Sequence, residues 1–290
     1  MQVDVGALHV TRPLEDSIGA VVENLRFDSL RDQEIGLIRD LVYAHKLVTI
    51  RDQSLSRAEY VAFARRLGRP QVYFQPHYHH PDFPEIFVSS NVEENGQKVG
   101  VSGTGRYWHT DYQFFNEPLP LTMQYPQVVP SLRETFYIDM ERVLLELPAA
   151  LAQSVAGARA LHDGRWRYKV QSGDIDRSLD EIYRELGKQY PAVTHPMVIT
   201  HPLTGRKSLY VSSGFTVGIA GRGRDEADAI LNELFAFIER PDHVHTLQWR
   251  QGEIAIWDNR TLLHKAGATP PGEPNVSYRV GIYDDLPFYS

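Results

Sequence analysis

Short runs of β-branched and aromatic residues recur along most of this chain, and turn-forming residues bound each run. Runs of this kind are typical of strands. They cover residues 46–50, 86–89, 122–125, 135–138, 197–200, 209–212, 254–257 and 278–283. A chain with many short strands needs a fold that buries them around a common core, which antiparallel sandwiches and jelly rolls achieve.

Helical periodicity is limited to the start of the chain and to a few insertions. Apolar residues three and four apart predict a helix over 29–44, and Ser56 with Glu59 forms a capping box that opens a helix ending at Gly68. Further helices are expected at 139–157 with an interruption near Pro148, at 178–188 and at 225–239. Residues 200–208 are expected to form a hairpin loop between two strands. No change of composition marks a linker, so we expect one domain over residues 1–290.

Charge and cysteine content exclude several classes of function. The chain has 30 basic and 37 acidic side chains, for a net charge of −7, which argues against non-specific nucleic-acid binding. It has no cysteine, so disulfides, thiolate metal sites and a cysteine nucleophile are excluded. No apolar stretch is long enough to span a membrane, and the first residues do not resemble a signal peptide. We expect a cytoplasmic protein with a small-molecule substrate, and a homo-oligomer is compatible with the sequence.

The segment Trp108-His109-Thr110-Asp111 carries the clearest chemical signal. On an extended strand, side chains two residues apart point to the same side, so His109 and Asp111 can bind one cation. A second histidine would complete the two-His, one-carboxylate arrangement that suits Fe(II). Chance alone gives on the order of one such pair in a chain of this composition.

A second pair, His80 and Asp82, is the competing candidate. It lies in a polar stretch flanked by prolines, which favours a turn over a strand. The neighbouring His77 and His79 suggest a zinc cluster together with His80. Adjacent side chains on a strand point apart, however, so a surface loop is the favoured interpretation.

His264 and Arg279 provide the late part of the pattern. His264 follows the strand 253–257, and Arg279 lies fifteen residues later inside another predicted strand. A charge inside a sheet needs a partner. The partner could be a bound dicarboxylate held through a bidentate fork, or an acidic side chain such as Asp258. The residues alone leave both alternatives open.

The order His109-Thr-Asp111, His264 and Arg279 resembles the TauD/TfdA group of iron(II)/2-oxoglutarate dioxygenases. A threonine of that group is matched by Thr135, which lies 26 residues after His109, whereas the corresponding place for the His80 pair holds Arg106. The resemblance implies a mostly β fold, namely a double-stranded β-helix of the jelly-roll, cupin-like type with flanking and inserted helices.

The same resemblance implies the roles of the site residues. His109, Asp111 and His264 would be the catalytic ligands of Fe(II), with 2-oxoglutarate and O2 as cosubstrates. The distal carboxylate of 2-oxoglutarate would lie between Thr135 and Arg279. Many members carry another arginine four residues before the last one, and Asn275 occupies that position here.

Within this group the chain resembles the isonitrile-forming enzymes, which convert an N-carboxymethyl 3-amino fatty acid into a 3-isocyano acid in secondary metabolism. The segments that carry this resemblance are Tyr73–Tyr78, Glu85–Asn91, Trp108–Phe114, Tyr125–Pro130, Thr135–Asp139 and Gly214–Ile219. It implies a substrate pocket lined by Tyr73, Phe74 and Tyr78. It also implies that Lys169 and Arg133 meet the carboxylates of the substrate.

Two departures concern the substrate carboxylates. The isonitrile-forming enzymes commonly have Lys-x-Arg, whereas Gln171 follows Lys169 here, and Ala268 replaces a common histidine four residues after His264. Without the resemblance, the three aromatic residues would be read as core side chains, Lys169 as a solvated strand end and Thr135 as an ordinary strand residue.

The sequence is compatible with three hypotheses about function. The first is isonitrile formation with two 2-oxoglutarate and two O2 per product. The second is hydroxylation of another small carboxylate, sulfonate or amino acid by the same chemistry. The third is a metal-binding or sensing protein without catalytic activity, which the complete ligand pattern disfavours.

Overall fold

The computed structural model of the protein describes residues 2–5, 8–11, 18–94, 96–170 and 172–290. Its α-helices are α1 (Asp32–His45), α2 (Arg57–Leu67), α3 (Met140–Glu146), α4 (Ala149–Val155), α5 (Leu179–Gln189) and α6 (Arg224–Ile238). Its strands are β1 (Gln2–Val5), β2 (Leu8–Thr11), β3 (Ala20–Glu23), β4 (Leu47–Ile50), β5 (Arg69–Gln71), β6 (Phe87–Ser90), β7 (Glu93–Glu94), β8 (Gln97–Lys98), β9 (Leu121–Val128), β10 (Glu134–Asp139), β11 (Arg159–His162), β12 (Val193–Pro196), β13 (Val198–Thr200), β14 (Lys207–Leu209), β15 (Thr216–Ile219), β16 (Val244–Gln248), β17 (Ile254–Asp258), β18 (Leu262–Ala266) and β19 (Val276–Tyr283).

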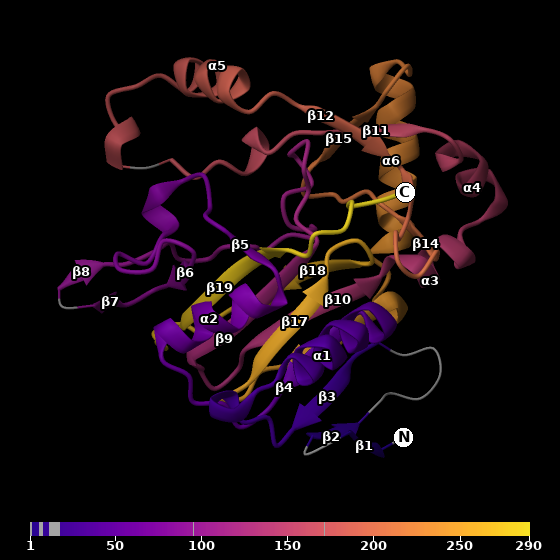
Figure 1. Ribbon diagram of the computed structural model, residues 1–290. Coiled ribbons are helices and arrows are strands. Elements are labelled where there is room, and N and C mark those ends of the chain that lie inside the picture. The colour runs from indigo at the N-terminus through magenta and orange to yellow at the C-terminus, as the bar shows by residue number, and fades with distance from the viewer. Residues whose placement is uncertain (1, 6–7, 12–17, 95, 171) are drawn as a thin grey trace.

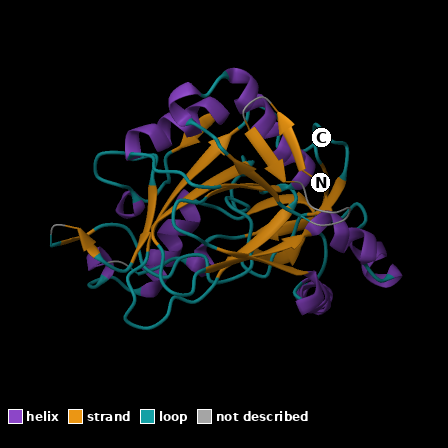
Figure 2. Cartoon of the chain, turned by 90° about the horizontal axis from the view of Figure 1, so that it is seen from below, coloured by secondary structure: helices purple, strands orange, loops and turns teal. Residues whose placement is uncertain are grey.

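Two packed sheets form the centre of the molecule. The larger sheet has the order β1-β2-β3-β4-β17-β9-β19-β5, with β6 also paired to β19, and the smaller one has the order β16-β10-β18. The rings of Tyr137 on β10 and Trp257 on β17 lie 5.6 Å apart and join the two sheets in one buried cluster. Viewed from below, strands fill the interior and helices lie outside them (Figure 2). The expected double-stranded β-helix is therefore the observed architecture.

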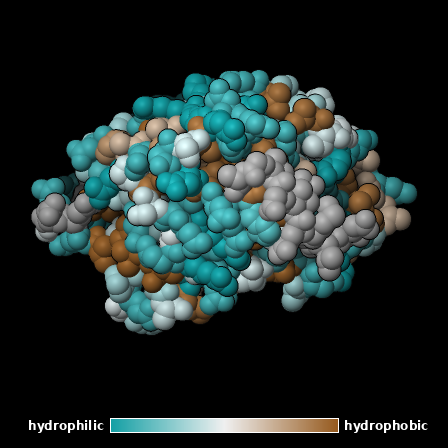
Figure 3. Space-filling view, turned by 60° about the horizontal axis from the view of Figure 1, so that its bottom comes forward, coloured by the Kyte–Doolittle hydropathy of each residue, from teal (hydrophilic) through white to brown (hydrophobic). Residues whose placement is uncertain are grey.

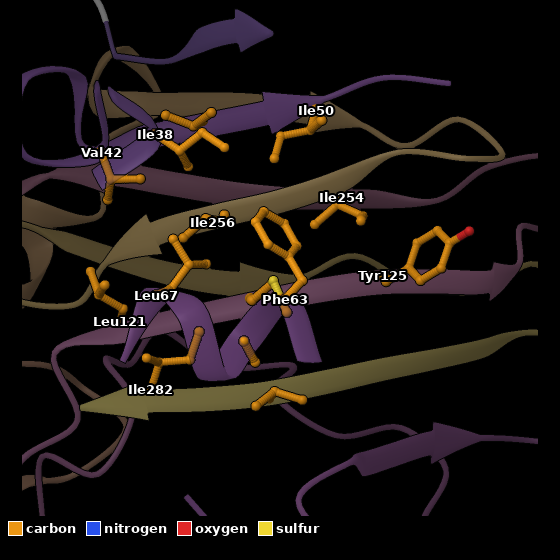
Figure 4. Packing of buried hydrophobic residues seen from close by; sticks show 14 of the residues in the cluster. Ile38, Val42, Ile50, Phe63, Leu67, Leu121, Tyr125, Ile254, Ile256 and Ile282 are labelled. Atoms are coloured by element: carbon orange, nitrogen blue, oxygen red, sulfur yellow. The ribbon is translucent and has the colours of Figure 1, made fainter. Parts of the chain in front are cut away.

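Helices α1 and α2 cover one face of the larger sheet (Figure 1). Phe63 and Leu67 of α2 point toward Ile256 of β17, and all three side chains are almost fully buried (Figure 4). Burying a side chain of this size contributes about 1.5–3 kcal/mol, so this face is a major source of stability. Helices α3, α4 and α6 belong to a second apolar cluster that includes Ile138 of β10.

The ends of α2 follow from its sequence. Ser56 accepts a hydrogen bond from the Glu59 amide, and the Glu59 carboxylate accepts one from the Ser56 amide, so the expected capping box is present. The helix ends at Gly68, where an added Cβ would lie 2.1 Å from the carbonyl oxygen of Tyr283. Glycine is needed here because β19 passes so close to the helix end.

The predicted elements agree with the structure except at a few places. The helix expected over 139–157 is divided into α3 and α4 at Pro148, as the sequence indicated, and β13 and β14 form the expected hairpin around residues 200–208. The strand expected at 209–212 is wrong beyond Leu209, because the chain turns away after β14. The remaining short strands were not predicted, namely β1–β3, β5, β7, β8, β11, β12, β15, β16 and β18.

A buried charge network fixes the turn between β17 and β18. Arg260 is 1 % exposed and makes a bidentate pair with Asp284 at 2.8 and 3.0 Å. Its Nε donates to the carbonyl of Phe288, so the C-terminal segment is tied to the turn. Asp258, at the end of β17, accepts a hydrogen bond from His201 at 2.8 Å.

Within the described ranges, no helix combines the length and the apolar character that a membrane crossing requires. Figure 3 shows one face that is mostly hydrophilic, with scattered hydrophobic side chains. Exposed large apolar side chains are concentrated in the segment around α5 and include Trp166, Val170, Ile175, Leu179 and Tyr183.

His162 on β11 makes stability depend on pH. Its side chain is fully buried, its Nδ1 lies 3.1 Å from Thr216 Oγ1, and burial lowers its pKa to about 3. In the unfolded chain the same imidazole titrates near 6.5. The unfolded state therefore binds more protons between these two values, and stability is lost as the pH falls through this window.

We expect His162→Phe to reduce the pH dependence of folding. Between pH 6.5 and 5, the native protein should lose up to about 1.4 kcal/mol of stability per pH unit through this residue, and the variant should not. Urea unfolding at pH 7 and pH 5 measures the difference for each protein. An equal loss of stability in both proteins would contradict this assignment.

Candidate metal centre

A single antiparallel bridge brings the two histidines together. The His109 amide donates to the His264 carbonyl at 3.0 Å, and the His264 amide donates to the His109 carbonyl at 2.8 Å. His264 lies on β18, whereas residues 109–111 form no continuous strand, so the strand expected there is wrong in extent. The chain turns directly after Asp111, where Tyr112 has a φ of 59°. The bridge keeps His109 extended beside β18.

The three predicted ligands converge in a buried cluster. Asp111 Oδ1 lies 3.8 Å from His109 Nε2, and Asp111 Oδ2 lies 3.8 Å from His264 Nε2. The candidate ligand atoms of the three residues all lie within 4.8 Å of one another. Among the described residues, no other group of three His, Asp or Glu side chains converges in this way. Two imidazole nitrogens and one carboxylate form the set that Fe(II) accepts while leaving positions for other ligands.

The protonation states of His109, His264 and Asp111 favour binding of a cation. His109 Nδ1 donates to the Tyr107 carbonyl at 2.8 Å, which leaves the Nε2 lone pair facing the cluster. Burial lowers the pKa of His109 and lowers that of His264 further, so both rings are neutral at pH 7. Burial by itself would raise the pKa of Asp111, but Arg279 and the two histidines outweigh it and lower this pKa to about 2.

The competing pair His80 and Asp82 does not form a metal site. His80 is buried and its Nδ1 accepts a hydrogen bond from the Asp82 amide at 3.2 Å, which is a turn contact. His77 lies in a short 3-10 turn over Pro76–Tyr78. The turn expected from the prolines is confirmed, although His80 is more buried than a surface loop would suggest.

An aromatic cavity opens over the candidate ligands on one side. Of the predicted substrate residues, Tyr73, Phe74, Tyr78 and Lys169 all line it, together with His109 and Asp111. Its other large lining residues are Phe87, Tyr107, Tyr112, Phe114, Arg165, Arg167, Tyr168, Tyr190 and Phe215. Most of these could not be singled out from the sequence, because aromatic residues in strands and loops are usually core residues.

Lys169 lies at the edge of this aromatic cavity. Its Nζ donates to the carbonyls of Ser102 and Gly103 at 2.6 and 2.9 Å, and burial lowers its pKa. Gln171 lies outside the described residues. The 102–103 loop therefore holds the charge of Lys169 at a wall of the aromatic cavity.

A second, polar cavity lies on the other side of His109. It is lined by Arg133, Thr135 and Asn275, with Ser277 and His264 nearby. The structure thus places Arg133 apart from the aromatic residues with which the sequence grouped it. Arg133 directly precedes β10 and lies two residues before Thr135, and both residues line this cavity.

Unpartnered polar groups characterise this second cavity. Arg133 Nη1 donates to Asn275 Oδ1, while Arg133 Nε and Ser277 Oγ are buried without a hydrogen-bond partner among the described residues. Burial lowers the pKa of Arg133 to about 10, so its guanidinium is still charged at pH 7. Buried polar groups are normally paired, so this arrangement fits an anionic ligand with several acceptor oxygens.

Arg279 lies at the boundary between the cavities and lines both. Its Nη1 donates to Asp111 Oδ1 at 2.8 Å, and its guanidinium lies 4.2 Å from the centre of the Phe87 ring. The acidic partner that the sequence required for Arg279 is therefore Asp111, not Asp258. The guanidinium of Arg279 can therefore pair with an anion in either cavity.

Comparison with known proteins identifies relatives over nearly the whole chain. Residues 11–280 match the family model described as "Taurine catabolism dioxygenase TauD, TfdA family". Pentalenolactone F synthase of Streptomyces arenae is 29% identical over 287 residues, which covers 92% of this chain and 93% of that protein. The α-ketoglutarate-dependent 2,4-dichlorophenoxyacetate dioxygenase of Cupriavidus pinatubonensis is 29% identical over 272 residues, covering 88% and 91%.

A solved structure supports the same relationship. The crystal structure of a taurine dioxygenase from Burkholderia xenovorans superimposes with a TM-score of 0.76 at 25% identity. The match covers 97% of this chain and 92% of that one. The sequence relatives and the shared fold thus extend over both packed sheets and all three candidate ligands.

We expect Asp111→Asn to weaken binding of a divalent metal by more than about 100-fold, because the site loses its only anionic ligand. Anaerobic titration calorimetry with Fe(II) or Co(II) measures the affinity. The matched control is Asp82→Asn, which should bind metal like the native protein. Equal affinities for the native protein and Asp111→Asn would show that the ligands are misassigned.

Proposed function

Since the chain belongs to the TauD/TfdA family of Fe(II)/2-oxoglutarate-dependent dioxygenases, we propose that it converts an N-carboxymethyl 3-amino fatty acid into the 3-isocyano acid. The observation that carries this proposal is the aromatic cavity beside the metal centre. Tyr73, Phe74, Tyr78 and Lys169, to which the resemblance to the isonitrile-forming enzymes assigns the substrate, all line that cavity. A substrate with an apolar chain and a carboxylate matches a wall of aromatic rings with a cation at its edge.

The residues present fit the cofactors of the family, which are Fe(II), 2-oxoglutarate and O2. His109, Asp111 and His264 would hold the iron. When bound, iron supplies two-electron oxidations that are driven by the conversion of 2-oxoglutarate and O2 into succinate and CO2. The three side chains leave the remaining positions for the cosubstrates.

The polar cavity would hold 2-oxoglutarate. Its distal carboxylate needs donors, and Arg133, Thr135 and Ser277 offer them on one wall. Trp249 Nε1 donates to Thr135 Oγ1 at 2.9 Å, which leaves the hydroxyl proton of Thr135 for a ligand. Arg133, directly before β10, thereby supplies the charge that Asn275, directly before β19, lacks, while Arg279 remains shared between the two cavities.

The proposed reaction balances in atoms and electrons. The fragment R–NH–CH2–COOH loses CO2 and four hydrogens to become R–NC, which is a four-electron oxidation. Each turnover with one 2-oxoglutarate and one O2 removes two hydrogens as water and releases succinate and CO2. Two turnovers therefore give one isonitrile, two succinates, three CO2 and two waters. Both turnovers need the substrate to stay in place, which the closely packed rings of Tyr73, Phe74 and Tyr78 favour.

One observation favours a second candidate, the oxidation of an acid with a single anionic group. Arg133 lies in the polar cavity, and Arg165 is paired with Asp163 at the edge of the aromatic one. Arg167 stacks on the ring of Tyr107 and donates to the carbonyl of Gly214. Lys169 and the shared Arg279 are then the cations available to a substrate. The dichlorophenoxyacetate dioxygenase is a relative with a monocarboxylate in its name.

The two candidates differ in product and stoichiometry. Incubation of the enzyme with an N-carboxymethyl 3-amino acid, Fe(II), 2-oxoglutarate and O2 should give a product lighter by CO2 and four hydrogens. Two succinates should form per product, as measured by mass spectrometry and succinate analysis. A hydroxylated end product with one succinate would reject isonitrile formation and support the second candidate.

Substitutions in the two cavities should affect different ligands. Arg133→Met should raise the KM for 2-oxoglutarate about 10- to 100-fold, because charge-assisted hydrogen bonds are lost. Lys169→Met should raise the KM for the acid substrate and leave that for 2-oxoglutarate unchanged. Lys98→Met, on the exposed strand β8, is the control for loss of a lysine. If Arg133→Met raised only the KM for the acid substrate, the assignment of Arg133 to 2-oxoglutarate would be wrong.

A further inference from the structure

A chain of buried hydrogen bonds leads to the carboxylate of Asp111 from the side opposite the cavities. Trp257 Nε1 donates to Asn259 Oδ1 at 3.0 Å, and Asn259 Nδ2 donates to Thr122 Oγ1 at 2.8 Å. Thr122 Oγ1 then donates to Asp111 Oδ2 at 2.6 Å. Trp257, Asn259 and Thr122 are each at most 1 % exposed.

The direction of every proton in this chain is determined by its first member. An indole N–H can only donate, so the atom of Asn259 that faces it must be the oxygen. The amide nitrogen of Asn259 is then turned toward Thr122 and donates to the hydroxyl oxygen. Thr122 must give its own proton to Asp111, whose ionised carboxylate can only accept. Hydrogen bonds arranged in series polarise one another, which strengthens the last one.

Asn259, the middle member of this series of hydrogen bonds, also contacts the loop that carries His109 and Asp111. The Asn259 amide donates to the Pro120 carbonyl at 2.8 Å, and the Asn259 carbonyl accepts a bond from Thr110 Oγ1 at 2.7 Å. The Asp111 amide also approaches Asn259 Oδ1 at 3.4 Å. Backbone and side chain of Asn259 therefore hold both sides of the turn at Asp111.

We propose that Thr122 is a positioning residue for the metal centre, oriented by Asn259 and Trp257. Its hydroxyl fixes the rotation of the Asp111 carboxylate and keeps Oδ2 engaged with the protein, so that Asp111 offers one oxygen to the metal. A carboxylate that binds through both oxygens would occupy a position that the cosubstrates need. The contact of Arg279 with Oδ1 differs, because Arg279 lines the two cavities and can exchange its partner when a ligand enters.

The test compares Thr122→Val with Thr122→Ser. Valine has the shape of threonine but no hydroxyl, and serine restores the donor. We expect Thr122→Val to weaken Co(II) binding about 10- to 100-fold and to change the visible Co(II) spectrum, which reports the number of ligands. Thr122→Ser should restore both measurements. Thr49→Val, at a buried threonine on β4 outside the site, is the matched control and should leave both unchanged.

A native affinity and a native Co(II) spectrum in Thr122→Val would overturn the proposal, as would a failure of serine to restore them. If the valine variant does not fold, Trp257→Phe tests the chain from its other end. Without the indole donor the Asn259 amide is free to turn its oxygen toward Thr122 and to compete with Asp111 for the hydroxyl proton. The expected result is a few-fold loss of Co(II) affinity with a changed spectrum, and native values would overturn the proposal. Neither measurement depends on the identity of the substrate.

Discussion

The bridge between His109 and His264 is the contact on which the rest of the centre depends. Two backbone hydrogen bonds join residues that are far apart in the chain, and they set both imidazoles side by side with ring centres 4.2 Å apart. β18 is in turn held by β10, where His264 is the direct partner of Tyr137. The metal centre is thus built by attaching one irregular loop to the edge of a rigid sheet, so its precision comes from the sheet and its charge largely from the loop.

Much of the architecture could be predicted because it follows from local patterns. The capping box at Ser56 and the interruption at Pro148 are local signals, and both appear in the structure where the sequence placed them. Strands such as β11 and β16 carry partly exposed or polar residues, and their pairing with distant strands gives them their conformation. Tertiary context of this kind is invisible in a single sequence.

In the candidate site, too, some features follow from local sequence and others depend on tertiary contacts. The spacing of His109 and Asp111 predicted a shared cation because it needs only a locally extended backbone, and the structure brings His264 to the same point. The position of Arg133 could not be predicted, since the sequence does not show which of two cavities a strand faces. The one available signal was its spacing of two from Thr135, which lines the same cavity. Thr122 and Asn259 gave no signal, because their contact with Asp111 depends on the register between β9 and β17.

The walls of the two cavities differ in kind, and this difference bears on how such enzymes diversify. About half of the residues that line the polar cavity lie on β6, β9, β10, β18 and β19, whose residues are also needed to hold the sheets together. The aromatic cavity is closed mainly by segments outside the strands, around residues 73–78, 104–107 and 164–169 and at the end of α5. Loops tolerate replacement and insertion far better than paired strands do. Descendants of one ancestral gene can therefore acquire new substrates by remodelling these segments, while the oxidising machinery is inherited without change.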